Sequence, residues 1–227
     1  MTSTGECTPA GGPISGPALV VLASGNGSNA GAVIDACADG RLPARVAAVV
    51  SNRADAGVLM RAAAASVPAV VVERRAGEAR ADYDLRLADA VGAYEPDWIV
   101  LAGFMRILTM GFLGRFPGRV VNLHPALPGD LPGTHAIERA WDEARAGIRT
   151  HTGAMVHLVP DEGVDVGPVQ GVRTLPIDPT ATLADLETRV HAVEHELLVT
   201  TLAALVAGEQ PMRLTHDEPA PTVGAHS

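Results

Sequence analysis

The chain has 227 residues, of which 47% are hydrophobic, and its formal net charge is −9 at pH 7. This length and composition favour one compact domain of enzyme size. The acidic balance, without any run rich in Lys and Arg, argues against a nucleic-acid partner or an anionic membrane surface.

Short β-branched runs alternate with Ala- and Leu-rich amphipathic segments along most of the chain. The expected strands are 18–24, 45–51, 68–72, 97–103 and 119–125, and the expected helices are 29–40, 55–66, 82–94 and 135–147. This alternation is typical of βαβ units and predicts an α/β fold with a mostly parallel sheet. Gly40 is expected to close the first helix, Asp55 to cap the second, and Pro96 to end the third before the next strand.

The pattern changes after residue 150. The apolar runs 150–159 and 169–175 are too close together for a helical crossover, so they are expected to pair antiparallel before a final helix over 182–208. Residues 1–16 and 209–227 are predicted to be a disordered leader and tail around a single domain, 17–208. The leader lacks the features of a signal peptide, two cysteines make no disulfide framework, and no apolar run reaches the roughly 18 residues of a membrane span. A cytoplasmic location is therefore expected.

The loop "SGNGSN" after the first expected strand has the composition of a phosphate-binding turn. Gly25 and Gly27 would let the backbone approach an anion, and the amides of Ser28 and Asn29 open a helix whose dipole favours negative charge. A tight turn without any ligand is the alternative. A dinucleotide is disfavoured because "VVSNR" supplies no acidic residue at the end of the second strand, although Arg53 would suit a 2′-phosphate.

Three further loops at strand ends carry unusual residues. The segment "FMRIL", 104–108, either lines the pocket of a flat aromatic ligand or is core, and its periodicity favours core. Asn122 and His124 share one face at the end of an otherwise apolar strand, with a site and simple loop hydrogen bonding weighed equally. The turn "VPDEGVDVGP" contains three carboxylates that composition alone cannot rank, Asp161, Glu162 and Asp165.

An imidazole, a carboxamide and a carboxylate above one sheet edge are the parts that acyl transfer needs. No activated Ser or Cys nucleophile is visible, so direct attack by a substrate amine is expected. The sequence has no CxxC pattern and no metal is expected, and His135, His151 and His157 are interpreted as ordinary polar or half-buried residues.

Five motifs, "VVLASGNGSN", "VVSNRADAG", "YEPDWIVLAGFMRIL", "VVNLHPALP" and "HLVPDEGVDVGPV", stand in the order and spacing of a known family. From about residue 18 to residue 208 the chain resembles the phosphoribosylglycinamide formyltransferases, the folate-dependent transformylases of purine synthesis. The resemblance implies a doubly wound, twisted sheet of the formyltransferase fold. It also implies 10-formyltetrahydrofolate as the co-substrate and 5-phosphoribosylglycinamide as the acceptor.

The same resemblance assigns roles to individual residues. Asn122, His124 and Asp165 would be catalytic, with the Asp165 carboxylate raising the pKa of His124. Phosphate and ribose contacts would come from Gly27, Ser28, Asn29 and Glu194. Folate contacts would come from Arg80, Met105, Arg106, Ile107, Leu108 and Asn122.

The chain departs from the family after "NLHP", where "ALPGDLPG" replaces the usual Leu-Leu-Pro run and predicts a smaller, more flexible loop with Gly129 and Asp130. Three alternative classes of protein compete with this assignment. A formyltetrahydrofolate deformylase would need an additional N-terminal domain, and a methionyl-tRNA formyltransferase a basic C-terminal domain. An NADP-binding reductase or a nucleotide-binding module would give no role to Asn122, His124 and Asp165. The expected partners are small molecules, and a homodimer is left open.

Overall fold

The structure is a computed structural model that describes residues 16–209, and the expected leader and tail fall almost wholly outside this range. Its seven strands form one sheet in the order β3-β2-β1-β4-β5-β6-β7. The strands are β1 (Ala18–Leu22), β2 (Arg45–Ser51), β3 (Ala69–Val71), β4 (Trp98–Leu101), β5 (Val120–His124), β6 (His151–Leu158) and β7 (Val169–Pro176). The helices are α1 (Ser28–Ala38), α2 (Gly57–Ala64), α3 (Arg80–Gly92), α4 (Met110–Leu113), α5 (Ala136–Arg145) and α6 (Leu183–Val206).

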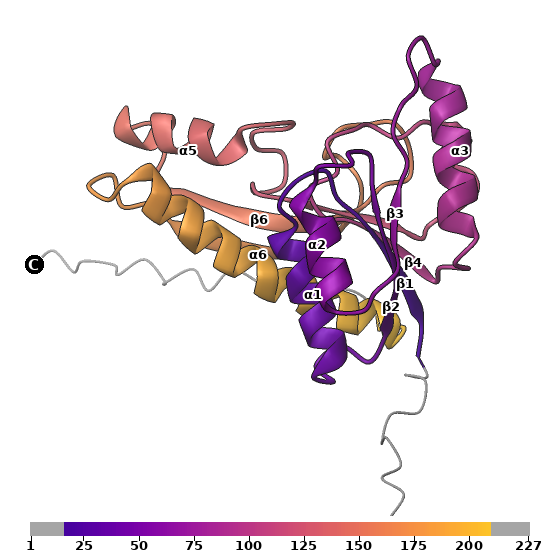
Figure 1. Cartoon of the computed structure of the whole chain (residues 1–227). Helices are drawn as coiled ribbons and strands as arrows, with labels where there is room; N and C mark the ends of the chain where they lie inside the picture. The colour runs from indigo at the N-terminus through magenta and orange to yellow at the C-terminus, as the bar shows by residue number, and fades with distance from the viewer. Residues whose placement is uncertain (1–15, 210–227) are drawn as a thin grey trace, which may run out of the picture.

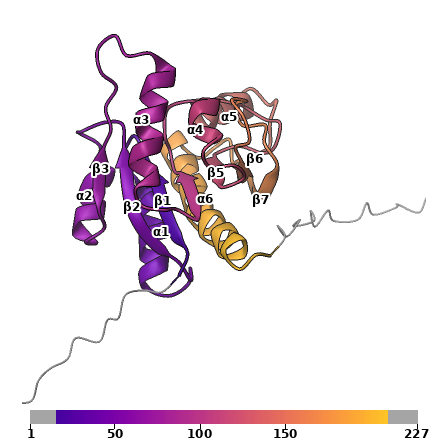
Figure 2. The same ribbon diagram turned by 90° about the vertical axis from the view of Figure 1, so that its right-hand side faces the viewer.

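The first five strands are parallel, whereas β6 pairs antiparallel with both β5 and β7. All five residues of β1 are buried, because helices cover both faces of the sheet at its centre. Figures 1 and 2 show α1 and α2 on one side of these strands and α3 on the other. The predicted α/β class, with a doubly wound parallel sheet and antiparallel C-terminal strands, is confirmed.

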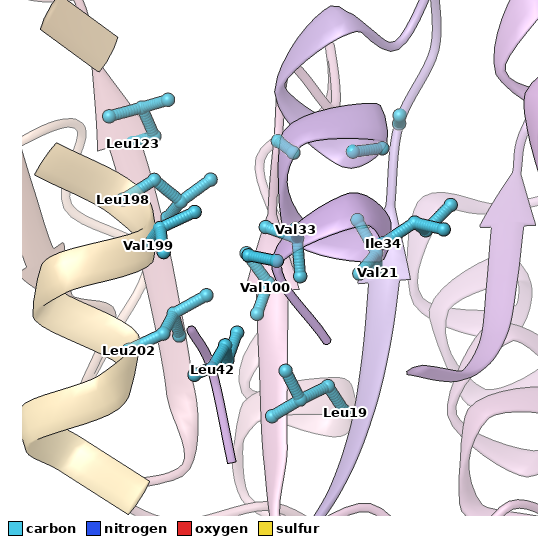
Figure 3. Packing of buried hydrophobic residues seen from close by; sticks show 14 of the residues in the cluster. Leu19, Val21, Val33, Ile34, Leu42, Val100, Leu123, Leu198, Val199 and Leu202 are labelled. Carbon is cyan, nitrogen blue, oxygen red and sulfur yellow. The ribbon is translucent and has the colours of Figure 1, made fainter. Parts of the chain in front are cut away.

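The two faces of the sheet bury separate apolar clusters. On one face, Val33 of α1 and Leu198 and Leu202 of α6 pack with Val21 and Val100 of the strands, as Figure 3 shows. The other face is covered by α3 and α4, whose buried residues include Tyr83, Leu87 and Phe112. Burial of this kind contributes about 1.5–3 kcal/mol per large apolar side chain. It fixes the strand ends from which the loops of the site extend.

The expected helix ends are partly correct. Gly40 follows the C-cap of α1 with φ of 83°, the left-handed conformation predicted for it. Asp55 does not cap α2, so that prediction is wrong: the N-cap is Ala56, without a side-chain hydrogen bond. The Asp55 carboxylate instead accepts two hydrogen bonds from Arg53, at 3.0 and 2.8 Å, because a charged guanidinium is a stronger partner than a backbone amide.

The antiparallel pairing at β5 determines the chemistry of the sheet edge. Its register sets Asn122 directly opposite His157 and His124 opposite Met155. Directly opposite residues have side chains on the same face, so β6 adds its own polar group to the face that carries Asn122. Within residues 16–209, none of the helices combines the length and the hydropathy needed to cross a bilayer.

Candidate active site

A cavity of about 400 Å³ lies beyond the carboxyl ends of β1, β4 and β5. This is where an open α/β sheet binds its ligands. Most of the residues expected to act on substrate line it together, namely Asn29, Met105, Arg106, Ile107, Leu108, Asn122, His124, Asp165 and Glu194. Three expected residues lie outside this lining, namely Gly27, Ser28 and Arg80.

Asp165 holds the polar part of the cavity together. One carboxylate oxygen accepts a hydrogen bond from the Asn122 amide (3.0 Å), and the other accepts one from the Gly133 backbone N–H (2.8 Å). The second oxygen also lies 3.4 Å from Nδ1 of His124. Burial acts to raise the pKa of Asp165, but His157, the Gly133 N–H and His124 outweigh it and hold that pKa below its ordinary value. Asp165 is therefore an anion at neutral pH.

His124 is 4% exposed, and both of its ring nitrogens face protein groups. Nε2 donates to the Leu131 carbonyl oxygen at 3.0 Å, and Nδ1 faces Asp165. Burial lowers the pKa of His124 below its ordinary value, and the opposing influence of the Asp165 carboxylate does not compensate. The Asp165 carboxylate raises this pKa as expected, but the expected net increase is wrong, because desolvation of the imidazolium is the larger effect. The ring is mainly neutral at pH 7, with Nδ1 unprotonated.

His157 is a site residue that the sequence interpretation missed. It is 2% exposed, not half-buried or solvated, and it lines the cavity. Its Nδ1 donates to the Leu158 carbonyl (2.8 Å), and its Nε2 lies 3.1 Å from the Asn122 amide nitrogen, with which it forms a hydrogen bond. Nε2 also lies 3.5 Å from Asp165. His157 thus orients the Asn122 amide, and the signal that could have revealed it was the β5 to β6 register.

The loop after His124, where the sequence departs from the family pattern, is held by more contacts than expected. Asp130 forms an ion pair with Arg149 at 2.6 Å, and Arg149 also pairs with Glu143 at 2.7 Å. Arg139 donates to the carbonyl oxygens of Leu131 (2.8 Å) and Pro132 (2.7 Å). These contacts hold the Leu131 carbonyl against His124, so the prediction of a more flexible loop finds no support in its contacts.

The 104–108 segment serves both as core and as cavity wall. Phe104 and Leu108 are buried in the sheet's second cluster, whereas Met105 and Ile107 are 66% and 49% exposed. Arg106 lies with its guanidinium carbon 4.3 Å from the centre of the Tyr83 ring. The two interpretations of this segment were not exclusive, because its side chains point in alternate directions.

Two polar side chains fix the backbone of that wall. The buried Ser24 hydroxyl accepts from the Met105 N–H at 2.8 Å and donates to Asn52 at 2.6 Å. Arg80 donates from Nε to the Ile107 carbonyl oxygen at 3.1 Å. Ser24 had no role in the sequence interpretation, because a serine at a strand end carries no distinctive pattern.

The glycine turn ends in the N-cap of α1. Gly27 is that N-cap, with φ of 73°, and no side chain caps the helix. The first amides of α1 therefore remain available to an anion at its positive end. Ser28 lies in a neighbouring groove that also contains Arg61, while Asn29 lines the main cavity. The turn stands between the two hollows.

Glu194 of α6 is 4% exposed, so it is not a solvated helix residue. Its carboxylate accepts from the Asn29 amide at 3.4 Å, and the Asn29 amide oxygen is itself buried without a partner among the described residues. Burial raises the pKa of Glu194 to about 7, against the weaker opposing influence of that hydrogen bond. An unpartnered acceptor beside an acid that titrates near neutral pH suits a ligand with hydroxyl or N–H donors.

Glu194 should make stability fall as pH rises. Between the ordinary pKa of 4.5 and about 7, the folded chain holds a proton that the unfolded chain releases, so the free energy of unfolding decreases across this window. Relative to the parent, Glu194→Gln should gain about 2 kcal/mol of stability on going from pH 5 to pH 7.5, measured by urea unfolding. The exposed Glu196→Gln is the control and should show no such gain. A pH-independent difference between Glu194→Gln and the parent would contradict the assignment.

No group of three or more His, Cys, Asp or Glu side chains within residues 16–209 is arranged to hold a metal ion. The groups that cluster at one end of the cavity are the neutral imidazole of His124, the carboxylate of Asp165 and the carboxamide of Asn122. A doubly wound sheet with these three groups at its carboxyl edge has the chemistry that acyl transfer requires.

Comparison with known proteins identifies the class. The profile described as "Formyl transferase" matches residues 18–202, and the chain belongs to this family. It is 40% identical over 200 residues to a phosphoribosylglycinamide formyltransferase from Dictyostelium discoideum, covering 82% of this chain and 97% of the relative. A Mycobacterium tuberculosis protein of the same name is 44% identical over 194 residues, covering 85% and 87%.

Solved structures agree with the sequence relatives. Glycinamide ribonucleotide transformylase 1 from Symbiobacterium toebii superposes with a TM-score of 0.80 at 36% identity, covering 85% of this chain and 89% of that one. The corresponding transformylase from Geobacillus kaustophilus has a TM-score of 0.77 at 42% identity, covering 84% and 98%. The described domain therefore spans nearly the whole of these related chains.

Proposed function

We propose that this chain transfers the formyl group of 10-formyltetrahydrofolate to the amine of 5-phosphoribosylglycinamide, a step of purine synthesis. Relatives that are 40% and 44% identical to this chain, matched over 97% and 87% of their own length, are named phosphoribosylglycinamide formyltransferase. The observation that carries the chemistry is the cluster of Asn122, His124 and Asp165 at one end of the cavity.

His124 is the proposed proton carrier. In the neutral ring its Nδ1 lone pair faces the Asp165 carboxylate at 3.4 Å, and protonation at Nδ1 converts this repulsion into an ion pair. As the acceptor amine forms its bond to the formyl carbon, Nδ1 takes the proton that the nitrogen loses. The imidazolium, stabilised by Asp165, then delivers that proton to the folate nitrogen as its bond to the formyl carbon breaks.

Asn122 is the proposed donor to the formyl oxygen, where negative charge develops. In the structure its amide nitrogen contacts Asp165 and His157, so a bound formyl oxygen must replace one of these contacts. The formyl oxygen is expected to replace the contact between the Asn122 amide and His157, because a carboxylate is a stronger hydrogen-bond acceptor than an imidazole. His157 then acts as a positioning residue for the unliganded amide.

The substrates would enter from two sides of this cluster. The free amides at the start of α1, after Gly27, support binding of the acceptor's phosphate, and Asn29 and Glu194 support contacts to its sugar. The apolar wall at 104–108 supports binding of the pterin ring. We also propose that the enzyme works in the cytoplasm on small molecules without nucleic acid or membrane, and that residues 17–208 form a single domain. Catalysis without a metal is part of the same proposal, and a homodimer remains compatible with it.

The direct test is an assay of formyl transfer with purified chain. We expect the donor to be consumed only when 5-phosphoribosylglycinamide is present, with one equivalent of formylated acceptor formed. A parallel reaction containing water alone as the acceptor distinguishes a deformylase, and one containing methionyl-tRNA distinguishes a tRNA formyltransferase. Donor consumption at the same rate without the ribosylglycinamide would refute the proposal.

A further inference from the structure

An ion pair beside the cavity lining joins the start of α3 to the turn that carries Asp165. Arg80, at the start of α3, donates to Glu162 at 3.0 Å while its Nε holds the Ile107 carbonyl at 3.1 Å. The other carboxylate oxygen of Glu162 accepts from the Met110 N–H at 3.1 Å. Glu162 is thus not a freely solvated turn residue. It joins the turn that carries Asp165 to the 104–108 wall.

The charges around the cavity make the Arg80 guanidinium a candidate partner for an anionic ligand. The lining contains three carboxylates, Asp161, Asp165 and Glu194, and one guanidinium, that of Arg106. Arg106 lies over the Tyr83 ring. Arg80 lies just outside the lining, bound to the carbonyl oxygen of Ile107, and the side chains of Arg80 and Glu162 are each 43% exposed. An anionic group that leaves the apolar wall toward solvent therefore passes the Arg80 guanidinium.

We propose that Glu162 is a specificity-determining residue: its carboxylate pairs with the Arg80 guanidinium, and a ligand carboxylate must displace it to bind there. This inference rests on the proposed function, because the donor of that reaction is a folate whose glutamate tail carries carboxylates. The Glu162 carboxylate and a tail carboxylate compete for the same guanidinium. Binding of the tail breaks the pair between Arg80 and Glu162 and keeps the hydrogen bond from Arg80 to Ile107.

The pair is well suited to exchange. Both side chains are partly solvated, and an exposed ion pair contributes only about 0.2–1 kcal/mol, so a ligand carboxylate can replace Glu162 at small cost. The exchange also frees Glu162 from Arg80, while its hydrogen bond from the Met110 N–H remains. The Glu162 carboxylate therefore both lowers the affinity for a charged tail and tethers the Asp165 turn.

Binding measurements with two ligands separate competition from loop support. Folic acid has the glutamate tail, whereas pteroic acid methylamide has the same ring system without tail carboxylates. By calorimetry, Glu162→Gln should bind folic acid about 3- to 5-fold more tightly than the parent and bind the methylamide unchanged. The gain should shrink as ionic strength rises, because the freed guanidinium is exposed to solvent.

Two further variants complete the test. Asp161→Asn removes a charge from the same turn and should leave the ratio of the two affinities at the parental value, whereas Arg80→Met in the Glu162→Gln background should abolish the gain. Equal changes for both ligands, or weaker binding of folic acid by Glu162→Gln, would overturn the competition. If neither ligand bound the parent chain, the proposed donor itself would be wrong, and this inference would fall with it.

Discussion

Asp165→Asn should lower turnover by about 10²-fold or more, which is the range of general acid–base catalysis. The substitution keeps the size of the side chain but removes the charge that faces Nδ1 of His124 at 3.4 Å. It also replaces one acceptor of the Asn122 and Gly133 hydrogen bonds by an amide nitrogen. The imidazolium that forms during transfer then loses its counter-ion.

The control variants come from the same turn. Asp161 accepts only its local Gly163 N–H among the hydrogen bonds of the described residues, and Glu162 holds Arg80 at the rim. Asp161→Asn and Glu162→Gln should therefore keep turnover within a few fold of the parent at saturating substrates. NMR titration adds a second measurement: the pKa of His124 should fall further in Asp165→Asn, because that carboxylate raises it. Parental turnover in Asp165→Asn, or greater damage from Asp161→Asn, would exclude the proposed role.

Gly27→Ala should destabilise the fold as well as the phosphate turn. A Cβ at Gly27 would lie 2.5 Å from Cβ of Val58 on α2, and φ there is 73°. Crowding of this kind costs about 1–3 kcal/mol, and the left-handed conformation adds about 1–2 kcal/mol for a residue with a side chain. Urea unfolding should show the loss, and acceptor affinity should fall with it because the amides of α1 move.

Gly25→Ala is the matched control in the same loop, because no atom lies within 4 Å of its added Cβ. Its free energy of unfolding should stay within about 0.5 kcal/mol of the parent. The double variant Gly27→Ala with Val58→Ala removes the obstructing Cγ2 of Val58 but keeps its Cβ, so it should recover only part of the stability relative to the sum of the two single changes. Equal stability of Gly25→Ala and Gly27→Ala would show that the contact with Val58 does not control this turn.

Several parts of the site could be predicted from local pattern. The alternation of residues along β5 set Asn122 and His124 on one face, and the parallel sheet set that face at the ligand-binding edge. The assignments of Asp165 and Glu194 to the site depended on the resemblance to a family. Composition could not choose Asp165 from its turn, because three carboxylates in five residues look alike until their partners are known.

The sequence alone determined what repeats at short range: the strand and helix periods, the glycine turn, and the order of the units that makes a parallel sheet. Only the tertiary structure decided what depends on partners distant along the chain. The β5 to β6 register brought His157 against Asn122, although 35 positions separate them. Burial, which no local pattern measures, left His124 neutral and gave Glu194 a pKa of about 7, because removing water penalises the charged form of each.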